Sequence, residues 1–159
     1  MSFKKFALVA SVFALAACGG TSESAPAAEE TAAAPAVETA LAAAAAVTGT
    51  THEIKMIGDE KGYRFEPANL TVKTGDAIKY VFVSGGPHNV AFEGTTLSAD
   101  VKKQLDANFS AKMAELSSNM MLNAGESVTI SFAGIPAGKY PYNCTPHLAM
   151  NMKGVITVE

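Results

Sequence analysis

Two segments of the chain carry sulfur and imidazole side chains whose spacing suits metal chemistry. Cys144, His147 and Met152 fall within nine residues near the C-terminus, and His88 follows the run Gly85-Gly86-Pro87. A thiolate, two imidazoles and a weak thioether form the ligand set of trigonal copper sites, because sulfur favours Cu(I) whereas imidazole accepts Cu(II). These side chains predict one copper ion held between a loop and a separate strand.

Other chemistries use the same residue types. In a hydrolase, Cys144 would be the nucleophile and His88 or His147 the base, but the sequence shows no evident Asp or Asn to orient that base, and Met152 would have no role. A zinc enzyme of the HExxH type lacks its helical motif. A dinuclear copper site needs two bridging cysteines, and this loop has one. A single copper centre is therefore the interpretation that uses all four side chains.

The elements that must position these ligands have the patterns of strands. In residues 128–132, apolar side chains alternate with Thr129 and Ser131, which is typical of a half-buried strand. Gly- and Pro-containing turns separate six further runs, at residues 51–57, 65–73, 77–83, 88–92, 139–143 and 155–158. Short strands of this kind predict an all-β fold, either an antiparallel β-sandwich or a Greek-key barrel. We favour a Greek-key β-sandwich.

Residues 98–116 break the strand pattern. Apolar side chains recur there at helical spacing, at positions 101, 105, 109, 113 and 116. Ser98 is a suitable N-cap, and Asp100 would lie in the first turn. We predict a helical insertion, as one amphipathic helix or two short ones, with its methionines filling the core. A methionine surface that loads copper is the alternative.

Several motifs resemble one protein family. Cys144-x-x-His147-x-x-x-x-Met152 with Pro87-His88-Asn89-Val90 resembles the cupredoxins, the type 1 or blue copper proteins. The pattern Phe65-x-Pro67-x-x-Leu70-x-Val72-x-x-Gly75-Asp76 is similar to the first strand signature of that family. Residues 121–126 and 138–140 resemble plastocyanin, whereas the loop 144–152 is more similar to pseudoazurin. Residues 49–159 are thus identified as a cupredoxin domain of the plastocyanin/pseudoazurin branch.

The resemblance implies a role for each candidate ligand. His88, Cys144 and His147 would bind copper strongly, and Met152 would be the long axial ligand. Met150 lies two residues closer to Cys144 than the axial position of the family, so we favour Met152.

Neighbouring residues would support the ligands. In the family, the position of Asn89 hydrogen-bonds to the copper loop and holds the two ligand segments together. Pro146 stiffens the loop and leaves no unbonded N–H near the metal. An apolar rim around the outer edge of His147 would suit brief docking of redox partners. The rim candidates are Gly85, Gly86, Pro87, Leu148 and Met150.

The resemblance implies a one-electron carrier between membrane redox partners, and not an enzyme. Asn143 stands where plastocyanin has an exposed tyrosine, and no acidic run is present, so we expect no second docking face. A protein for copper storage or delivery is the alternative, and a Cys-His hydrolase is less favoured.

The N-terminal segment predicts export. Lys4 and Lys5 precede the apolar run 6–17, which is too short for a stable membrane span, so residues 1–17 read as a signal peptide. Small residues before Cys18 resemble a bacterial lipobox, in which Cys18 would carry lipid; cleavage of an ordinary signal peptide is the alternative. Residues 18–48, with 13 Ala from position 19 onward, read as a linker that anchors the domain to a bacterial membrane, in the periplasm or at the cell surface.

The amino-acid composition excludes some classes of protein and of binding partner. The chain has 159 residues, enough for one modest domain. Its formal net charge is -3, with 17% charged residues, which excludes a basic nucleic-acid binder and a fully disordered chain. Residues 49–159 hold 10 basic and 11 acidic side chains, so this domain is close to neutral. We expect a monomer.

Overall fold

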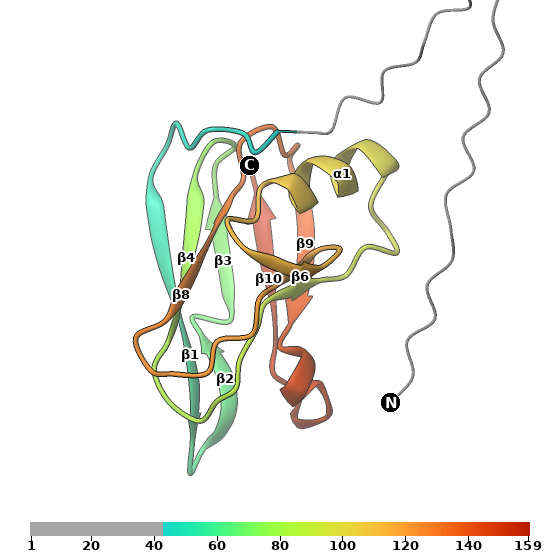
Figure 1. Ribbon diagram of the computed structural model, residues 1–159. Coiled ribbons are helices and arrows are strands. Elements are labelled where there is room, and N and C mark those ends of the chain that lie inside the picture. The colour runs from blue at the N-terminus through green and yellow to red at the C-terminus, as the bar shows by residue number, and fades with distance from the viewer. Residues whose placement is uncertain (1–42) are drawn as a thin grey trace, which may run out of the picture. The chain divides into compact units, whose positions relative to one another are not determined.

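The computed structural model describes residues 43–159, which form two facing β-sheets with one α-helix (Figure 1). The predictions for the signal peptide, for Cys18 and for most of the linker lie outside these residues. Of the helices in this range, none combines the length and the apolar character needed to cross a bilayer.

The strands of each sheet come from distant parts of the chain. One sheet has the order β2-β1-β4-β8, formed by β1 (Thr51–Asp59), β2 (Gly62–Glu66), β4 (Ala77–Phe82) and β8 (Ser127–Ser131). The other has the order β3-β10-β9-β5-β7-β6, formed by β3 (Asn69–Val72), β5 (Ala91–Phe92), β6 (Lys112–Ala114), β7 (Ser117–Ser118), β9 (Gly138–Asn143) and β10 (Lys153–Val158). Two pairs, β1 with β4 and β3 with β10, are parallel, and the other pairs are antiparallel. The predicted all-β Greek-key β-sandwich is confirmed, but the two parallel pairs depart from the antiparallel pairing that was predicted.

Alternation along the strands builds the core between the sheets. Ile78, Tyr80 and Phe82 of β4 are buried, whereas Lys79 between them is exposed. Tyr142 of β9 approaches Tyr80 edge-on from the other sheet, with ring centroids 5.5 Å apart. The period of two thus sends one face of each strand inward, as the sequence pattern indicates.

The helical insertion is shorter than predicted. Helix α1 (Ala99–Ala107) begins as expected, with the Ser98 hydroxyl accepting a hydrogen bond from the N–H of Val101 at 3.4 Å. The prediction is wrong for residues 108–116, because the Asn108 side chain donates to the carbonyls of Ser131 and Ala133 and ends the helix.

The chain beyond the helix contacts both sheets instead. Phe109 forms an isolated bridge with Ile130 of β8, and residues 112–114 form strand β6 of the other sheet. The side chain of Met113 is 60% exposed, so it does not fill the core as predicted.

The two ends of the sandwich differ in their elements (Figure 1). The first described residues, α1 and the C-terminus lie at one end. The β1–β2 hairpin and the 3₁₀ helix η1 (Thr145–Met150), drawn in dark orange, lie at the other. The predicted copper loop therefore lies at the end opposite to the point where the described chain enters the domain.

Candidate metal centre

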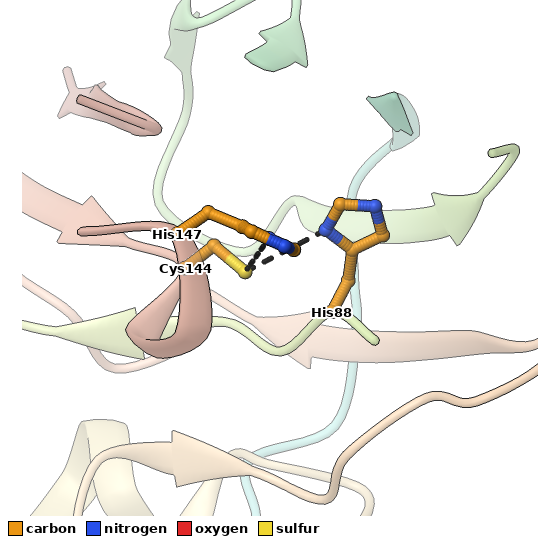
Figure 2. A group of neighbouring side chains, drawn as sticks. All are labelled: His88, Cys144 and His147. Atoms are coloured by element: carbon orange, nitrogen blue, oxygen red, sulfur yellow. Dashed lines mark hydrogen bonds between the residues drawn. The ribbon is translucent and has the colours of Figure 1, made fainter. Parts of the chain in front are cut away.

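Three predicted ligands meet at the η1 end of the sandwich, with their donor atoms facing one another (Figure 2). The Cys144 Sγ lies 3.6 Å from Nδ1 of His88 and 3.4 Å from Nδ1 of His147. The donor atoms all lie within 4.8 Å of one another, and all three residues are buried. Bonds of about 2.0–2.3 Å to one central metal ion would separate neighbouring ligand atoms by about 3.6 Å, so the cluster fits a single ion.

One loop positions Cys144, His147 and Met152. Cys144 follows β9 and is the N-cap of η1, and its carbonyl accepts the N–H of His147 at 3.0 Å. The loop closes through two more backbone bonds, from Cys144 N–H to the Met152 carbonyl at 3.0 Å and from Met152 N–H to the His147 carbonyl at 3.2 Å. Pro146 occupies the first turn of η1, where a missing N–H leaves no bond unmade.

His88 comes from the segment between β4 and β5. Its backbone pairs in both directions with Met121, at 3.0 and 2.8 Å. Its ring Nε2 lies 2.9 Å from the carbonyl oxygen of Ser84. Because a carbonyl can only accept, Nε2 carries the proton and Nδ1 presents a lone pair toward Cys144.

Asn89 links the two ligand segments. Its Oδ1 accepts the N–H of Thr145 at 2.7 Å, and its Nδ2 donates to the hydroxyls of Thr145 and Ser117, each at 3.1 Å. The side chain is 1% exposed, so these bonds are made away from water. The residue after His88 is thereby bonded to the residue after Cys144.

Burial shifts the ionisation of all three ligands. It lowers the pKa values of His88 and His147, and for His147 the proximity of His88 adds to the effect. Burial also raises the pKa of the Cys144 thiol, although the N–H groups of Asn89 and His147 act in the opposite direction. Neutral imidazoles suit metal binding, and a buried thiolate needs a neighbouring positive charge such as a metal ion.

The burial and the raised pKa of Cys144 also argue against this thiol as a catalytic nucleophile. A reactive cysteine is partly exposed and has a lowered pKa, whereas Cys144 is 0% exposed. Within residues 43–159, the hydrogen bonds of the His88 and His147 rings go to no carboxylate. The orienting acid of a Cys-His hydrolase is thus missing from the described site.

The two candidate axial methionines differ in burial. Met152 is 0% exposed, whereas Met150 is 56% exposed on the outside of η1.

The predicted rim residues lie near the surface. Gly86, Pro87, Leu148 and Met150 are exposed, and Gly85 is half-buried. The structure adds two exposed apolar side chains that the sequence analysis missed, Val83 at the end of β4 and Leu122 beside the partner of His88. Val83 lies within a predicted strand and Leu122 within a predicted motif, and the bridge between His88 and Met121 brings the segment of Leu122 beside a ligand.

Tyr63 of β2 is a further contact that the sequence analysis missed. Its ring stacks on the ring of His147, with centroids 3.7 Å apart and planes at 16°. No sequence pattern indicates this contact, because residues of β2 and η1 meet only in the folded chain.

The third histidine lies elsewhere. His52 is half-buried, and its Nε2 lies 3.0 Å from Oδ2 of Asp76.

Known proteins are similar to this chain in sequence and in fold. The sequence model of the family described as copper binding proteins, plastocyanin/azurin family, matches residues 52–159. Plastocyanin from Nostoc punctiforme is 33% identical over 118 residues, covering 72% of this chain and 78% of that protein. Chloroplastic plastocyanin from Tetradesmus obliquus is 35% identical over 115 residues, covering 72% of this chain and 71% of that protein.

A solved structure agrees with these matches. The oxidized form of plastocyanin from Dryopteris crassirhizoma has a TM-score of 0.53 at 28% identity, covering 68% of this chain and 100% of that chain. The family consists of electron carriers rather than enzymes, and the His88–Cys144–His147 cluster suits its copper cofactor. The chain belongs to the plastocyanin/azurin family of copper-binding proteins.

Proposed function

We propose that the protein carries single electrons between redox partners by cycling one copper ion between Cu(II) and Cu(I). The observation that carries this proposal is the convergence of one buried thiol and two imidazoles from two segments of a rigid sandwich. His88, Cys144 and His147 are the strong ligands in this proposal. Bound copper supplies the redox chemistry.

The protein contributes a fixed set of donor atoms. The backbone bonds within the loop and the Asn89 bridge hold the donors from both sides. Cu(I) and Cu(II) prefer different ligands and geometries, so a site that both accept must resist rearrangement. Small rearrangement favours fast electron transfer over storage or release of the metal.

Met152 would be the fourth and weaker ligand of the copper ion, through its thioether sulfur. It is buried, and its N–H is bonded to the carbonyl of His147, which keeps it beside the strong ligands. Met150 is exposed and more suited to contact with a partner.

The proposed docking surface surrounds the ligand segments. It consists of Gly85, Gly86, Pro87, Leu148 and Met150, to which we add Val83 and Leu122. Weak, short-lived redox encounters bury little area, and a nearly neutral domain with exposed apolar side chains suits them. Redox proteins or membrane redox complexes are the proposed partners, and the carrier acts as a monomer.

We also propose that the chain is exported and held to a bacterial membrane by lipid at Cys18, with the domain in the periplasm or at the cell surface. The basic and apolar runs before Cys18 support this placement. Membrane fractionation and intact-mass analysis of the mature chain test it. A lipidated Cys18 is expected at the N-terminus, and Cys18→Ser should release the domain from the membrane. A mature chain without lipid would refute the anchor alone.

Copper titration tests the function. Adding Cu(II) to the purified domain should give intense blue absorption at one equivalent and a reversible one-electron wave in voltammetry. Cys144→Ser should bind copper without the blue band. A colourless, readily exchanged complex in the unmodified domain would instead support copper storage or delivery.

A further inference from the structure

The two ligand imidazoles are held in different ways. The His88 ring is fixed through its second nitrogen, which bonds to the Ser84 carbonyl at 2.9 Å. Within residues 43–159, the His147 ring makes a hydrogen bond only through its Nδ1, on the side of Cys144. Ligand histidines usually have a bonding partner for the second nitrogen, and this partner fixes the ring orientation. His147 therefore needs another means of orientation.

Tyr63 lies where it can provide that orientation. Its ring stacks on His147 at 3.7 Å, the shortest distance between ring centroids in the described part of the chain. The same ring approaches His88 at 6.1 Å and 62°. A stacked ring resists rotation of its neighbour about the side-chain bonds, because rotation would lose the contact between the two faces.

Two glycines, Gly58 and Gly85, leave the space that the ring of Tyr63 occupies. In the β1–β2 pairing, Gly58 lies opposite Tyr63, and a Cβ at Gly58 would come within 2.6 Å of Cε1 of that ring. Gly85, at φ +72°, packs against Gly58 so closely that a Cβ there would lie 2.3 Å from the Gly58 Cα. Any side chain at either position would displace the tyrosine ring or separate the two segments.

Gly58 is hydrogen-bonded to the segment that carries His88. The N–H of Gly58 bonds to the Ser84 carbonyl at 2.7 Å, and this carbonyl also accepts the His88 ring nitrogen. The hydroxyl of Ser84 donates to the Gly58 carbonyl at 3.1 Å. The backbone that orients His88 thus also supports the strand that carries Tyr63.

We propose that Tyr63 is a positioning residue of the metal centre: its ring holds the imidazole of His147 in the ligating orientation, as the bond to Ser84 does for His88. This inference rests on the proposed ligand set but not on electron transfer. Its consequence is slower release of copper and an ordered His147 ring in the metal-free protein.

The test compares Tyr63→Leu and Tyr63→Phe. Leucine fills space without a ring face, whereas phenylalanine keeps the ring and removes only the hydroxyl. The matched control is Arg64→Ala, which removes the two bonds from Arg64 to Asp59, at 2.8 and 2.9 Å, from the same hairpin but leaves the ring in place. All variants are made in the complete domain.

Two measurements follow the His147 ring. The first is the rate at which the Cu(I) chelator bicinchoninate removes copper from the reduced protein. Tyr63→Leu should raise this rate about three- to tenfold, the range given by the energy of an aromatic pair, whereas Tyr63→Phe and Arg64→Ala should stay near the parent rate. The second is proton NMR of the metal-free protein, in which the Tyr63 ring current should shift the carbon-bound ring protons of His147 upfield, and Tyr63→Leu should remove this shift.

Three results would overturn the proposal. They are a parent-like extraction rate in Tyr63→Leu, extraction rates raised equally in Tyr63→Phe and Tyr63→Leu, or extraction rates raised equally in Arg64→Ala and Tyr63→Leu. The NMR shift in the unmodified protein is a test that needs no variant to fold, and its absence would also refute the stacking. Neither measurement involves electron transfer, so their failure is distinct from a missing electrochemical wave.

Discussion

The two ends of the sandwich each use a buried asparagine to join distant segments, but with different consequences. At the metal end, Asn89 bonds to Ser117 and Thr145 and joins the His88 segment to the copper loop. At the opposite end, Asn108 joins α1 to the end of β8, to the residues just after it and to the first described residues.

The opposite end satisfies its polar groups with protein partners. The Asn108 Nδ2 donates to the carbonyls of Ser131 and Ala133 at 2.9 and 3.0 Å, and its Oδ1 accepts from Ala45 N–H and Gln104 Nε2 at 2.9 and 2.8 Å. The final residues of the predicted linker are thus bonded to the domain.

Asp76 has a similar role near the start of β1. Its carboxylate accepts the N–H groups of Thr50 and Lys73, at 2.8 and 2.9 Å, and contacts His52. These bonds tie the first strand to the turn before β4.

At the metal end, by contrast, the hydrogen bonds fix the backbone and leave donor atoms pointing at a common centre. Nδ1 of both histidines and Sγ of Cys144 converge there (Figure 2). Buried asparagines therefore stabilise the fold at one end and hold the metal-ligand segments together at the other. Four predictions test this difference.

The largest effect is expected from Asn108→Ala. Two buried carbonyls would lose their partner, so the free energy of unfolding should fall by about 2–4 kcal/mol. Urea denaturation of the metal-free protein measures this loss. The blue absorption of the copper form should stay unchanged, and an altered spectrum would contradict the separation of the two ends.

Asn89→Ala should act mainly on the metal. Loss of a residue that supports the ligands typically weakens metal binding by about 10–100-fold, which competition with a chelator can measure. Thr145→Val is the matched control, because it removes one hydroxyl but keeps the N–H that Asn89 accepts. If Asn108→Ala weakened copper binding as much as Asn89→Ala, the comparison would fail.

Replacement of the methionines should sharpen the description of the metal end. Met152→Leu should keep the blue band and raise the reduction potential, because Cu(II) loses a weak axial donor. A tenfold selective loss of Cu(II) affinity would correspond to about 60 mV. Met150→Leu should leave the potential near the parent value in voltammetry; a shift only in this variant would make Met150 the axial ligand.

The smallest effect is a change in the pH dependence of stability at the opposite end. Hydrogen bonds from the N–H of Lys73, the His52 side chain and the N–H of Thr50 lower the pKa of Asp76 to about 2. Because the unfolded value lies near 3.9, this stabilisation is present above about pH 4 and is lost as pH falls through about 2.

Asp76→Asn should therefore unfold more easily than the parent at pH 7, and the difference should narrow between pH 4 and pH 2. Thermal unfolding followed by circular dichroism measures it. A constant difference across this range would mean that the charge of Asp76 does not contribute.

Some features could be predicted from the sequence because they repeat within one element or one loop. The alternation in β8 needed only the period of two. Ser98 and the start of α1 followed from local capping chemistry. The spacing of Cys144, His147 and Met152 indicated a shared loop, since short separations leave few other arrangements.

Other features depended on contacts between elements. The helical spacing at residues 98–116 was overridden at Asn108 by carbonyls at the end of β8 and just after it. His52 gained a carboxylate partner 24 positions away.

By itself, the sequence determined the donor types, most of the strands and the family, because each depends on residue identity and short-range spacing. Only the tertiary structure decided that Tyr63 stacks on His147 and that Met152 rather than Met150 is buried. The physical reason is that stacking and burial depend on how β2, η1 and the two sheets pack. Such packing brings together residues whose separation along the chain follows no period.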